Sequence, residues 1–413
     1  MKENGKVIQK RMAMSRSHMA KERERKSKEN YAYILAEERM AEQEEIRKRH
    51  ERQKEVEEYR KEMKEKEELI KEIMIVRNVY NQKNNDFKKY AMEYYDIIAL
   101  SENCKDKNSF TILLSSYDTK LEELHLQLKF IDEKVKFLQS PSMKKFRFEC
   151  QKAINIPVNA ISGINQQHLT DKYERLHILL MGKSWPNVNE HPYGADFCKN
   201  ILAKKLVNQG ETLVSSKPKM AFPIAAIIVA LWSDHSDFGD LLLSHFYNVC
   251  PFTVPIFMPR MVGQSDDDYY KLMGYKYAED GTIEKHDKFL KRMSGLMRLY
   301  ASITITTQRK GITKTNPHGL QNAWRWLAAI LNFDLCATFL LDMLEVAGNT
   351  LWIAYPKQFH KLLILLSEEY YPRMKNVGSI GSGPLIRLEE FLRNSLAKGS
   401  ISPPDGQLPL NFW

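Results

Sequence analysis

The sequence predicts an all-α protein in which a long charged helix precedes a packed helical region. Between Gly5 and Pro141 there is no glycine and no proline, and most residues are types that lose little freedom on entering a helix. From about Leu169 onward, apolar runs at helical spacing alternate with short breaks rich in Pro, Gly and Asn. The period-2 alternation typical of β-strands is almost absent. Two architectures therefore share one chain.

Charge is distributed unevenly along the 413 residues. Forty of the first 80 residues are charged, whereas 28% of the whole chain is. This change in composition marks a boundary between a solvated segment and a packed one. We expect a charged long helix or coiled coil over residues 1–100, a helical hairpin and linker over 101–168, and an all-α domain over 169–413. The formal net charge of +10 fits either a partner with negative charge or plain solubility.

Neither a membrane span nor an enzyme motif is predicted. The longest apolar run, Ala221–Trp232, is about half of the roughly 20 residues that cross a bilayer, so we expect a buried core helix. The five cysteines are widely spaced, which argues against a disulfide framework or a paired-cysteine zinc site and for a reducing compartment. No phosphate loop, HExxH or GxSxG pattern occurs, and no GxGxxG pattern lies between a strand and a helix. We expect no catalytic residues, no metal and no enzyme activity.

The charged helix carries a weak heptad pattern. Val56, Met63 and Ile70 recur every seven residues, while Lys66 and Arg77 interrupt the complementary positions. Two interpretations stay open, namely a coiled coil that self-associates or tethers, and a single solvated helix with charge pairs along it.

A basic cluster lies near the N-terminus, where Arg23, Arg25, Lys26 and Lys28 are close together. The cluster is interpreted either as a segment that contacts RNA or as a solvated tail. The lack of interleaved aromatic residues favours the tail.

The segment over residues 101–168 is interpreted as a helical hairpin followed by a linker. Residues 101–109 contain turn-forming and cap-forming types, and the apolar residues from Leu121 to Leu138 form an amphipathic pattern. Pro141 and Pro157, followed by Gly163, then predict the linker into the packed region.

The packed region is predicted to contain about ten helices joined by short loops. They span residues 170–182, 195–216, 222–232, 237–249, 265–273, 284–308, 318–332, 335–347, 351–371 and 384–398. Asp280-Gly281 is typical of a tight hairpin turn. Consecutive helices of this length predict pairs that stack into an irregular, solenoid-like slab.

Three features of the packed region have structural interpretations. The glycine-rich segment Gly378–Gly383 is a helix-to-helix loop rather than a nucleotide cradle. His318 lies at a predicted helix start and is interpreted as a cap or packing residue. Asp266–Asp268 supply negative charge to the first turn of a helix, which the helix dipole favours.

Several lysines cluster on and after the predicted helix over residues 195–216. They are Lys199, Lys204, Lys205, Lys217 and Lys219. They form either a site for a polyanion or an ordinary solvated face.

Six long segments of the packed region, in the same order, resemble one known family. They are Val207–Glu211, Cys250–Pro255, Phe289–Ala301, Pro317–Ala328, Leu341–Asn349 and Glu368–Arg373. They closely resemble the C-terminal domain of the Gle-one family of messenger-RNA export mediators of the nuclear pore. The resemblance covers roughly residues 170–413, and the charged helix is similar to that family's self-associating coiled coil in character only.

The resemblance implies a HEAT-like or MIF4G-like all-α domain with no chemistry of its own. It implies binding to a DEAD-box RNA helicase, whose turnover the domain stimulates while export proteins are stripped from emerging mRNA. As further partners it implies an FG nucleoporin, a pore scaffold nucleoporin, translation initiation or termination factors, and a second copy through the coiled coil. The implied location is the nuclear envelope, at the cytoplasmic face of the nuclear pore complex, and the cytoplasm.

In some members of that family, inositol hexakisphosphate bridges the domain and the helicase. Matching the family's pocket to this sequence places Lys204, Lys205 and His245 as the residual basic residues. Asn208, Asn248 and Val249 stand at positions that are mostly basic in strongly inositol-dependent members. Each lost cation removes about 1–3 kcal/mol from a charge-assisted contact. We therefore expect weak or no inositol binding and a helicase that is gripped directly.

Composition and periodicity alone support a second class of function equally well. A coiled coil that clusters an α-solenoid binding slab is also expected of a scaffold that links pore or translation components without regulating a helicase. Stimulated helicase turnover belongs only to the first hypothesis.

Overall fold

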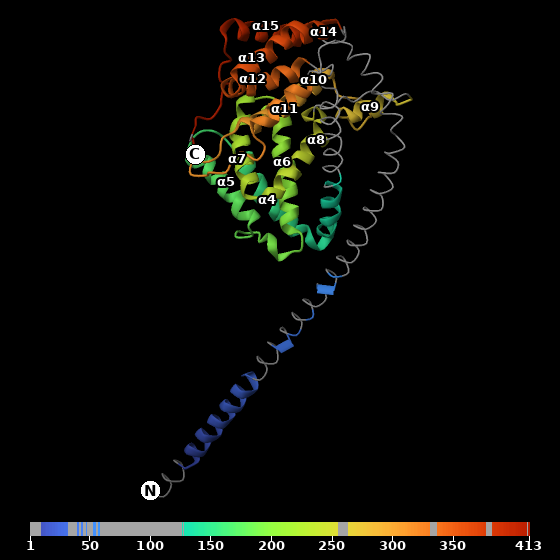
Figure 1. Ribbon diagram of the computed structural model, residues 1–413. Coiled ribbons are helices and arrows are strands. Elements are labelled where there is room, and N and C mark those ends of the chain that lie inside the picture. The colour runs from blue at the N-terminus through green and yellow to red at the C-terminus, as the bar shows by residue number, and fades with distance from the viewer. Residues whose placement is uncertain are drawn as a thin grey trace. The chain divides into compact units, whose positions relative to one another are not determined.

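The computed structural model describes residues 10–31, 39–40, 43, 47, 53–54, 57, 126, 128–254, 263–330, 337–376, 382–410 and 412–413. The chain divides into two compact units, Met1–Met92 and Glu93–Trp413 (Figure 1).

In the N-terminal unit, residues 10–31 form a continuous helix, which agrees with the predicted long charged helix. Its described side chains are almost all exposed. The predicted heptad positions Met63 and Ile70 and the turn at residues 101–109 lie outside the described residues, and so does Val56. The choice between a coiled coil and a solvated helix therefore stays open.

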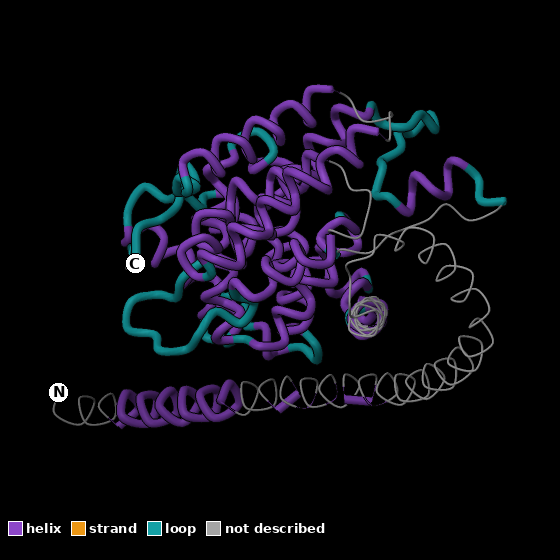
Figure 2. Tube along the Cα trace, turned by 45° about the horizontal axis from the view of Figure 1, so that its top comes forward, coloured by secondary structure: helices purple, strands orange, loops and turns teal. Residues whose placement is uncertain are grey.

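The second unit is built from helices, as predicted for an all-α fold. They are α4 (Lys144–Asn159), α5 (Gln166–Leu180), α6 (Gly194–Gln209), α7 (Ala221–Asp234), α8 (Ser236–Val249), α9 (Asp266–Leu272), α10 (His286–Ile305), α11 (Leu320–Ile330), α12 (Ala337–Ala354), α13 (Pro356–Leu365), α14 (Tyr371–Asn376) and α15 (Ser382–Lys398). Two short π-helical turns, η4 (Gly210–Val214) and η7 (Leu366–Tyr370), extend α6 and α13. In Figure 2 the described part of this unit is drawn as helices and loops, without a strand.

Neighbouring helices pack in succession from one end of the unit to the other. α4 packs against α5 and α6, and α6 packs against α8. α7 contacts α5, α8 and α10, and α10 in turn contacts α11 and α12. α12 then packs against α13 and α15, which lie at the far end from α4 and α5 (Figure 1). The order agrees with the predicted stack of helices, with α7 and α10 at its centre.

α7 is the apolar run that the sequence assigns to the core. All residues from Ala221 to Trp232 are buried, because this helix is covered by its neighbours on every side. A helix that is apolar all round is expected in such a place. None of the helices that the structure describes combines the length and the apolar character that crossing a bilayer requires.

α4 corrects the predicted linker. Pro157 lies inside this helix, close to its end, where a missing N–H costs only one hydrogen bond. Cys150, Ile154 and Val158 recur at helical spacing and are fully or almost fully buried. Burial of this stripe against α5 and α6 outweighs the helix-breaking tendency of one proline near the C-terminal turn.

α12 corrects the predicted break after residue 347. Gly348 lies inside the helix, where a Cβ atom would stand 2.9 Å from Cδ1 of Ile401. The glycine therefore makes room for the chain that follows α15 rather than ending α12. The break comes at Tyr355 instead, because Pro356 takes the first position of α13. The helix predicted over residues 351–371 is thus divided among α12, α13, η7 and the first residue of α14.

Other predicted features are confirmed. The Asp280-Gly281 turn closes a hairpin in which the Ala278 N–H donates to the Thr282 carbonyl over 2.8 Å. Asp266–Asp268 occupy the first turn of α9, as expected from the dipole. His318 is a packing residue, stacked on Trp232 with a ring-centroid distance of 5.3 Å. Residues 378–381 of the glycine-rich segment lie outside the described part.

Candidate functional site

The residues assigned to the inositol pocket lie on two helices that pack against each other, α6 and α8. Lys204 is exposed on α6, and Lys205 and Asn208 are half-buried on the same helix. Asn248 is exposed and Val249 half-buried at the C-terminal end of α8. The structure therefore brings together the two segments that carry the predicted site.

His245 lies within α8 and is only 8% exposed. Its Nε2 stands 2.7 Å from Oδ1 of Asn200 on α6. The amide nitrogen of Asn200 donates to Oδ1 of Asp132 over 3.3 Å, so its oxygen faces the imidazole and Nε2 of His245 donates to it. Burial, with a smaller contribution from the charge of Lys204, lowers the pKa of His245 to about 4.

The predicted pocket therefore carries less positive charge than its residue types suggest. A histidine with a pKa of about 4 is neutral at pH 7, and Nε2 of this one is hydrogen-bonded to Asn200. His245 therefore helps to hold α8 against α6 and adds no positive charge at neutral pH. Residue types near His245 do not indicate this structural role, because the contact with Asn200 joins residues 45 positions apart.

Two other lysines of the sequence cluster are neutralised by acids. Nζ of Lys199 lies 2.5 Å from Oδ2 of Asp237, at the start of α8. Nζ of Lys219 lies 2.8 Å from Oδ2 of Asp405. In the described part of the chain, no ion pair joins Lys204 or Lys205 to an acid. The positive charge that remains on α6 is thus confined to these two residues.

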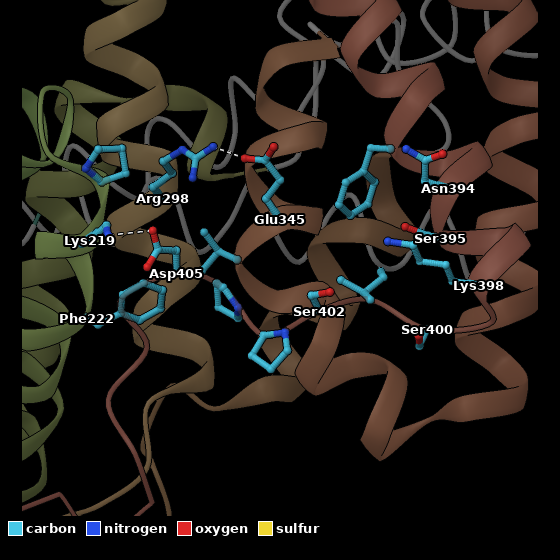
Figure 3. Close-up of a pocket in the computed structure, with 16 residues that line it drawn as sticks. Lys219, Phe222, Arg298, Glu345, Asn394, Ser395, Lys398, Ser400, Ser402 and Asp405 are labelled. Carbon is cyan, nitrogen blue, oxygen red and sulfur yellow. Dashed lines mark hydrogen bonds and ion pairs between the residues drawn. The ribbon is translucent and has the colours of Figure 1, made fainter.

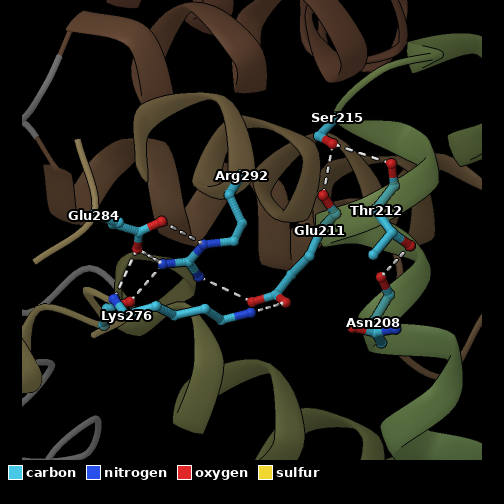
Figure 4. A network of polar contacts seen from close by, with 8 residues as sticks. Asn208, Glu211, Thr212, Ser215, Lys276, Glu284 and Arg292 are labelled. Atoms are coloured by element: carbon cyan, nitrogen blue, oxygen red, sulfur yellow. Dashed lines mark hydrogen bonds and ion pairs between the residues drawn. The ribbon is translucent and has the colours of Figure 1, made fainter. Parts of the chain in front are cut away.

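A buried ion network lies one helical turn beyond Asn208, at the start of η4. Arg292 of α10 donates from Nη1 to Oε1 of Glu211 over 2.9 Å and from Nη2 to the Gly274 carbonyl over 2.7 Å (Figure 4). Arg292 also bonds Glu284, and Nζ of Lys276 lies 2.5 Å from Oε2 of Glu211. Two carboxylates thus meet one guanidinium and one ammonium.

This network attaches the hairpin that carries Lys276 and Glu284 to α10 and to η4 at the end of α6. A Cβ atom on Gly274 would approach the Val249 carbonyl to 3.0 Å, so the hairpin begins directly beside the last turn of α8. Sequence reasoning missed the network. The available signal was a charged residue, Arg292, on the otherwise apolar stripe of a long helix.

A close approach of two glycines also holds η4 against α10. A Cβ atom on Gly295 of α10 would stand 2.3 Å from the carbonyl oxygen of Gly210, so α10 can pack at this distance only because residue 295 has no side chain. Gly210 begins the π-helical turn, a local widening that is frequent at functional sites.

A pocket of about 560 Å³ lies elsewhere, among α7, α10, α12, α15 and the residues after α15 (Figure 3). Four of its five charged side chains pair with one another, since Arg298 bonds Glu345 and Lys219 bonds Asp405. The fifth is Lys398 of α15. Arg298 also lies 2.7 Å from Asp342, whose pKa burial raises to about 7. The internal pairing leaves a single lysine, Lys398, rather than a concentrated charge for a ligand. Among the residues that the structure describes, no group of three or more His, Cys, Asp or Glu side chains is arranged to hold a metal ion.

Comparison with known proteins decides the family. A family model described as GLE1-like protein matches residues 123–367. The chain belongs to this family. The resemblance stated from the six ordered segments is confirmed, and the match begins further upstream than residue 170.

Curated relatives of this GLE1-like chain carry the name mRNA export factor GLE1. The Rattus norvegicus protein is 41% identical over 283 residues, which are 66% of this chain and 40% of that protein. The Drosophila melanogaster protein is 37% identical over 290 residues, or 68% of this chain and 42% of that protein. The chain thus spans about two fifths of the length of these relatives.

A solved structure shares the fold of this GLE1-like chain. It is described as an S. cerevisiae Dbp5 C-terminal domain bound to Gle1 and IP6. The match has a TM-score of 0.63 at 20% identity and covers 71% of this chain and 98% of that one. At this level of identity the likeness establishes the all-α architecture.

We predict that Arg292→Met strongly destabilises the second unit. The substitution keeps the volume of the side chain but leaves Glu211 and Glu284 as buried carboxylates without their main partner, which costs about 3–5 kcal/mol. The control is Arg373→Met, because Arg373 pairs with Glu369 at 3.7 Å and both side chains are more than half exposed; it is expected to cost less than about 1 kcal/mol. Urea unfolding measures both values, and equal losses would contradict the role assigned to the network.

We also predict that His245 makes stability fall in mild acid. The folded-state pKa of about 4 lies below the ordinary value near 6.5, so the unfolded chain takes up the proton first and stability is lost as the pH drops below about 6.5. His245→Gln is expected to keep a donor towards Asn200 and to reduce the loss between about pH 7 and about pH 5 by about 2 kcal/mol. The exposed His18→Gln is the control and should leave the loss unchanged. Urea unfolding at both pH values tests this, and an unaltered loss in His245→Gln would refute it.

Proposed function

We propose that this chain acts as an mRNA export factor that binds a DEAD-box RNA helicase and raises its turnover without catalysing a reaction itself. The observation that carries the proposal is the combination of family and fold. The relatives are named mRNA export factor GLE1, and the matching solved chain belongs to a complex described as Dbp5 C-terminal domain bound to Gle1 and IP6.

The physical basis is differential binding. A partner that binds one conformation of the helicase better than the other shifts the population towards that conformation, by at most the difference in affinity. Such a partner needs a surface that is already in place. The end of α6 meets this requirement, because η4 is held to α10 by the Glu211–Arg292 pair and by the close contact at Gly295.

We place the helicase-binding surface on the α6–α8 face, around Lys204, Lys205 and Asn208. Lys204 is exposed, and both lysines lack a recorded acidic partner within the described residues. Inositol hexakisphosphate is a weak ligand of this face, because Asn208, Asn248 and Val249 carry no charge and His245 is buried and neutral at pH 7. The helicase is therefore held mainly by direct contacts.

The remaining parts of the proposal concern location and assembly. We assign the chain to the cytoplasmic face of the nuclear pore complex and the cytoplasm. Its further partners are an FG nucleoporin, a pore scaffold nucleoporin and translation initiation or termination factors, with self-association through residues 1–100. These assignments derive from the family resemblance, whereas the division of the chain at residues 100 and 168 derives from composition and from the turn-forming residues and prolines of the sequence.

We predict that the chain stimulates RNA-dependent ATP hydrolysis by the DEAD-box helicase of its own cell that is most similar to Dbp5. Lys204→Glu/Lys205→Glu should reduce this stimulation, because reversed charge on α6 repels a surface that the native face attracts. Lys357→Glu/Lys361→Glu makes the same charge change on the exposed surface of α13 and should leave stimulation intact. Steady-state phosphate release measures all three. Binding without any stimulation would instead support a scaffold that does not regulate the helicase.

We predict that restoring two cations strengthens inositol hexakisphosphate binding. Asn208→Lys/Asn248→Arg should tighten the dissociation constant at least about tenfold, since each charge-assisted contact contributes about 1–3 kcal/mol. Gln358→Lys/Asn394→Arg adds the same charge at exposed positions on α13 and α15 and serves as the control. Isothermal titration calorimetry at physiological salt is the measurement. Submicromolar affinity of the unaltered chain would overturn the assignment of a weak site.

A further inference from the structure

The helix over residues 10–31 concentrates the positive charge of the chain. It contains eight Lys and Arg residues against three Glu, a surplus that equals half of the formal net charge of +10. The described side chains of this helix are exposed, with Glu22 half-buried. What the helix can bind depends on which of these cations are already neutralised.

Two of the cations that the sequence singled out are paired within the helix. Nη2 of Arg25 lies 3.0 Å from Glu22, and its Nη1 lies 3.5 Å from Glu29. Nζ of Lys28 lies 2.6 Å from Glu24. All three glutamates of the helix are used in these pairs, and they face the same sides of the helix as Arg25 and Lys28.

Arg16 and Arg23 are in a different situation. Positions three and four residues away on either side of them hold Met12, Ala13, Met19, Ala20, Lys26 and Ser27, and none of these is acidic. Residues at this spacing are the neighbours of a side chain on a helix surface. The helix thus has one face, formed by Met12, Arg16, Met19, Arg23 and Lys26, on which both arginines lack acidic neighbours at this spacing. Lys26 lies on the same face, and its acidic neighbours, Glu22 and Glu29, are both paired with Arg25. We call this face the arginine face.

A second copy of the chain is a poor occupant of the arginine face. Met12 and Met19 are seven residues apart, but the complementary seam positions are Arg16 and Arg23. A homodimeric coiled coil along this seam would bring the arginines of two chains together, and like charges repel. The seam also lacks the second apolar column that a coiled-coil partner of any charge requires.

A membrane surface is also a poor occupant. Helices that lie in the headgroup region present Trp, Phe or Leu on the inserted face. The arginine face offers only Met12 and Met19, each 58% exposed. Arginines with their charge unneutralised, by contrast, match the phosphates of a nucleic acid, which the guanidinium binds in bidentate fashion.

We propose that the arginine face binds the backbone of single-stranded RNA. Arg16 and Arg23 donate hydrogen bonds to phosphate oxygens about two helical turns apart along the axis, Lys26 extends the positive surface, and the two methionines contact ribose or base. Binding of this kind is independent of sequence and sensitive to salt. The inference goes beyond the proposed helicase function and does not depend on it.

The test compares two double variants of the full chain that lose the same charge. Arg16→Gln/Arg23→Gln removes the arginine face, and Arg25→Gln/Lys28→Gln removes the cations that are already paired. Gln is nearly as good a helix former as Arg and Lys, and circular dichroism verifies equal helix content. The probe is fluorescein-labelled oligouridylate, followed by fluorescence anisotropy between about 50 and about 200 mM salt.

The expected result is an unequal loss. Arg16→Gln/Arg23→Gln should weaken binding at least about fivefold and reduce the slope of log affinity against log salt by about 1.4, since each phosphate contact to a single strand contributes about 0.7. Arg25→Gln/Lys28→Gln should change the slope by less than half as much. Equal losses, or no RNA binding by the unaltered chain, would overturn the proposal. So would equally tight binding of polyglutamate or of anionic lipid vesicles, which would assign the face to an acidic protein or a membrane.

Discussion

The burial of Arg292 between two glutamates is the constraint on which the end of α6 depends. A guanidinium cannot lose its charge, so its donors must be satisfied where it lies, and here they meet Glu211, Glu284 and the Gly274 carbonyl. Removing any partner would leave a charge unpaired in the low-dielectric interior. The hairpin, η4 and α10 are therefore fixed as one junction, beside the last turn of α8, and the face that α6 and α8 present is formed before any partner arrives.

Much of the fold could be predicted from local pattern, and the errors have one cause. A continuous apolar run located α7, periodic apolar residues located α8 and α10, and the Asp280-Gly281 pair located the hairpin, because these signals lie within a single element. Pro157 and Gly348 were misinterpreted because their effect depends on what packs against them. A stripe buried under α5 and α6 holds α4 together across Pro157, and Ile401, 53 residues away in sequence, occupies the space that Gly348 leaves. Local propensity is a weak prior where tertiary contacts supply the energy.

The candidate site, too, could be predicted only in part. Ordered sequence segments led to α6 and α8, which the structure places in contact. The charge state of the site could not be obtained from residue types, because it is set by pairs such as His245 with Asn200, Lys199 with Asp237, and Glu211 with Arg292. These partners lie 38 to 81 residues apart in the chain. A sequence shows which residues can be charged, whereas burial and partners decide which of them are.

The distribution of satisfied charge separates two kinds of recognition. In the helical body, buried Arg292 and half-buried Arg298 face carboxylates at close range, so that this part is recognised through its shape and a few surface side chains. On the helix over residues 10–31, Arg16 and Arg23 have no acid within helical reach, so that recognition there operates through charge. Dissolved ions screen exposed charges far more than buried pairs. Salt therefore separates the two: contacts made by the helix weaken steeply as the ionic strength rises, while the junction around Arg292 keeps the body in the same shape.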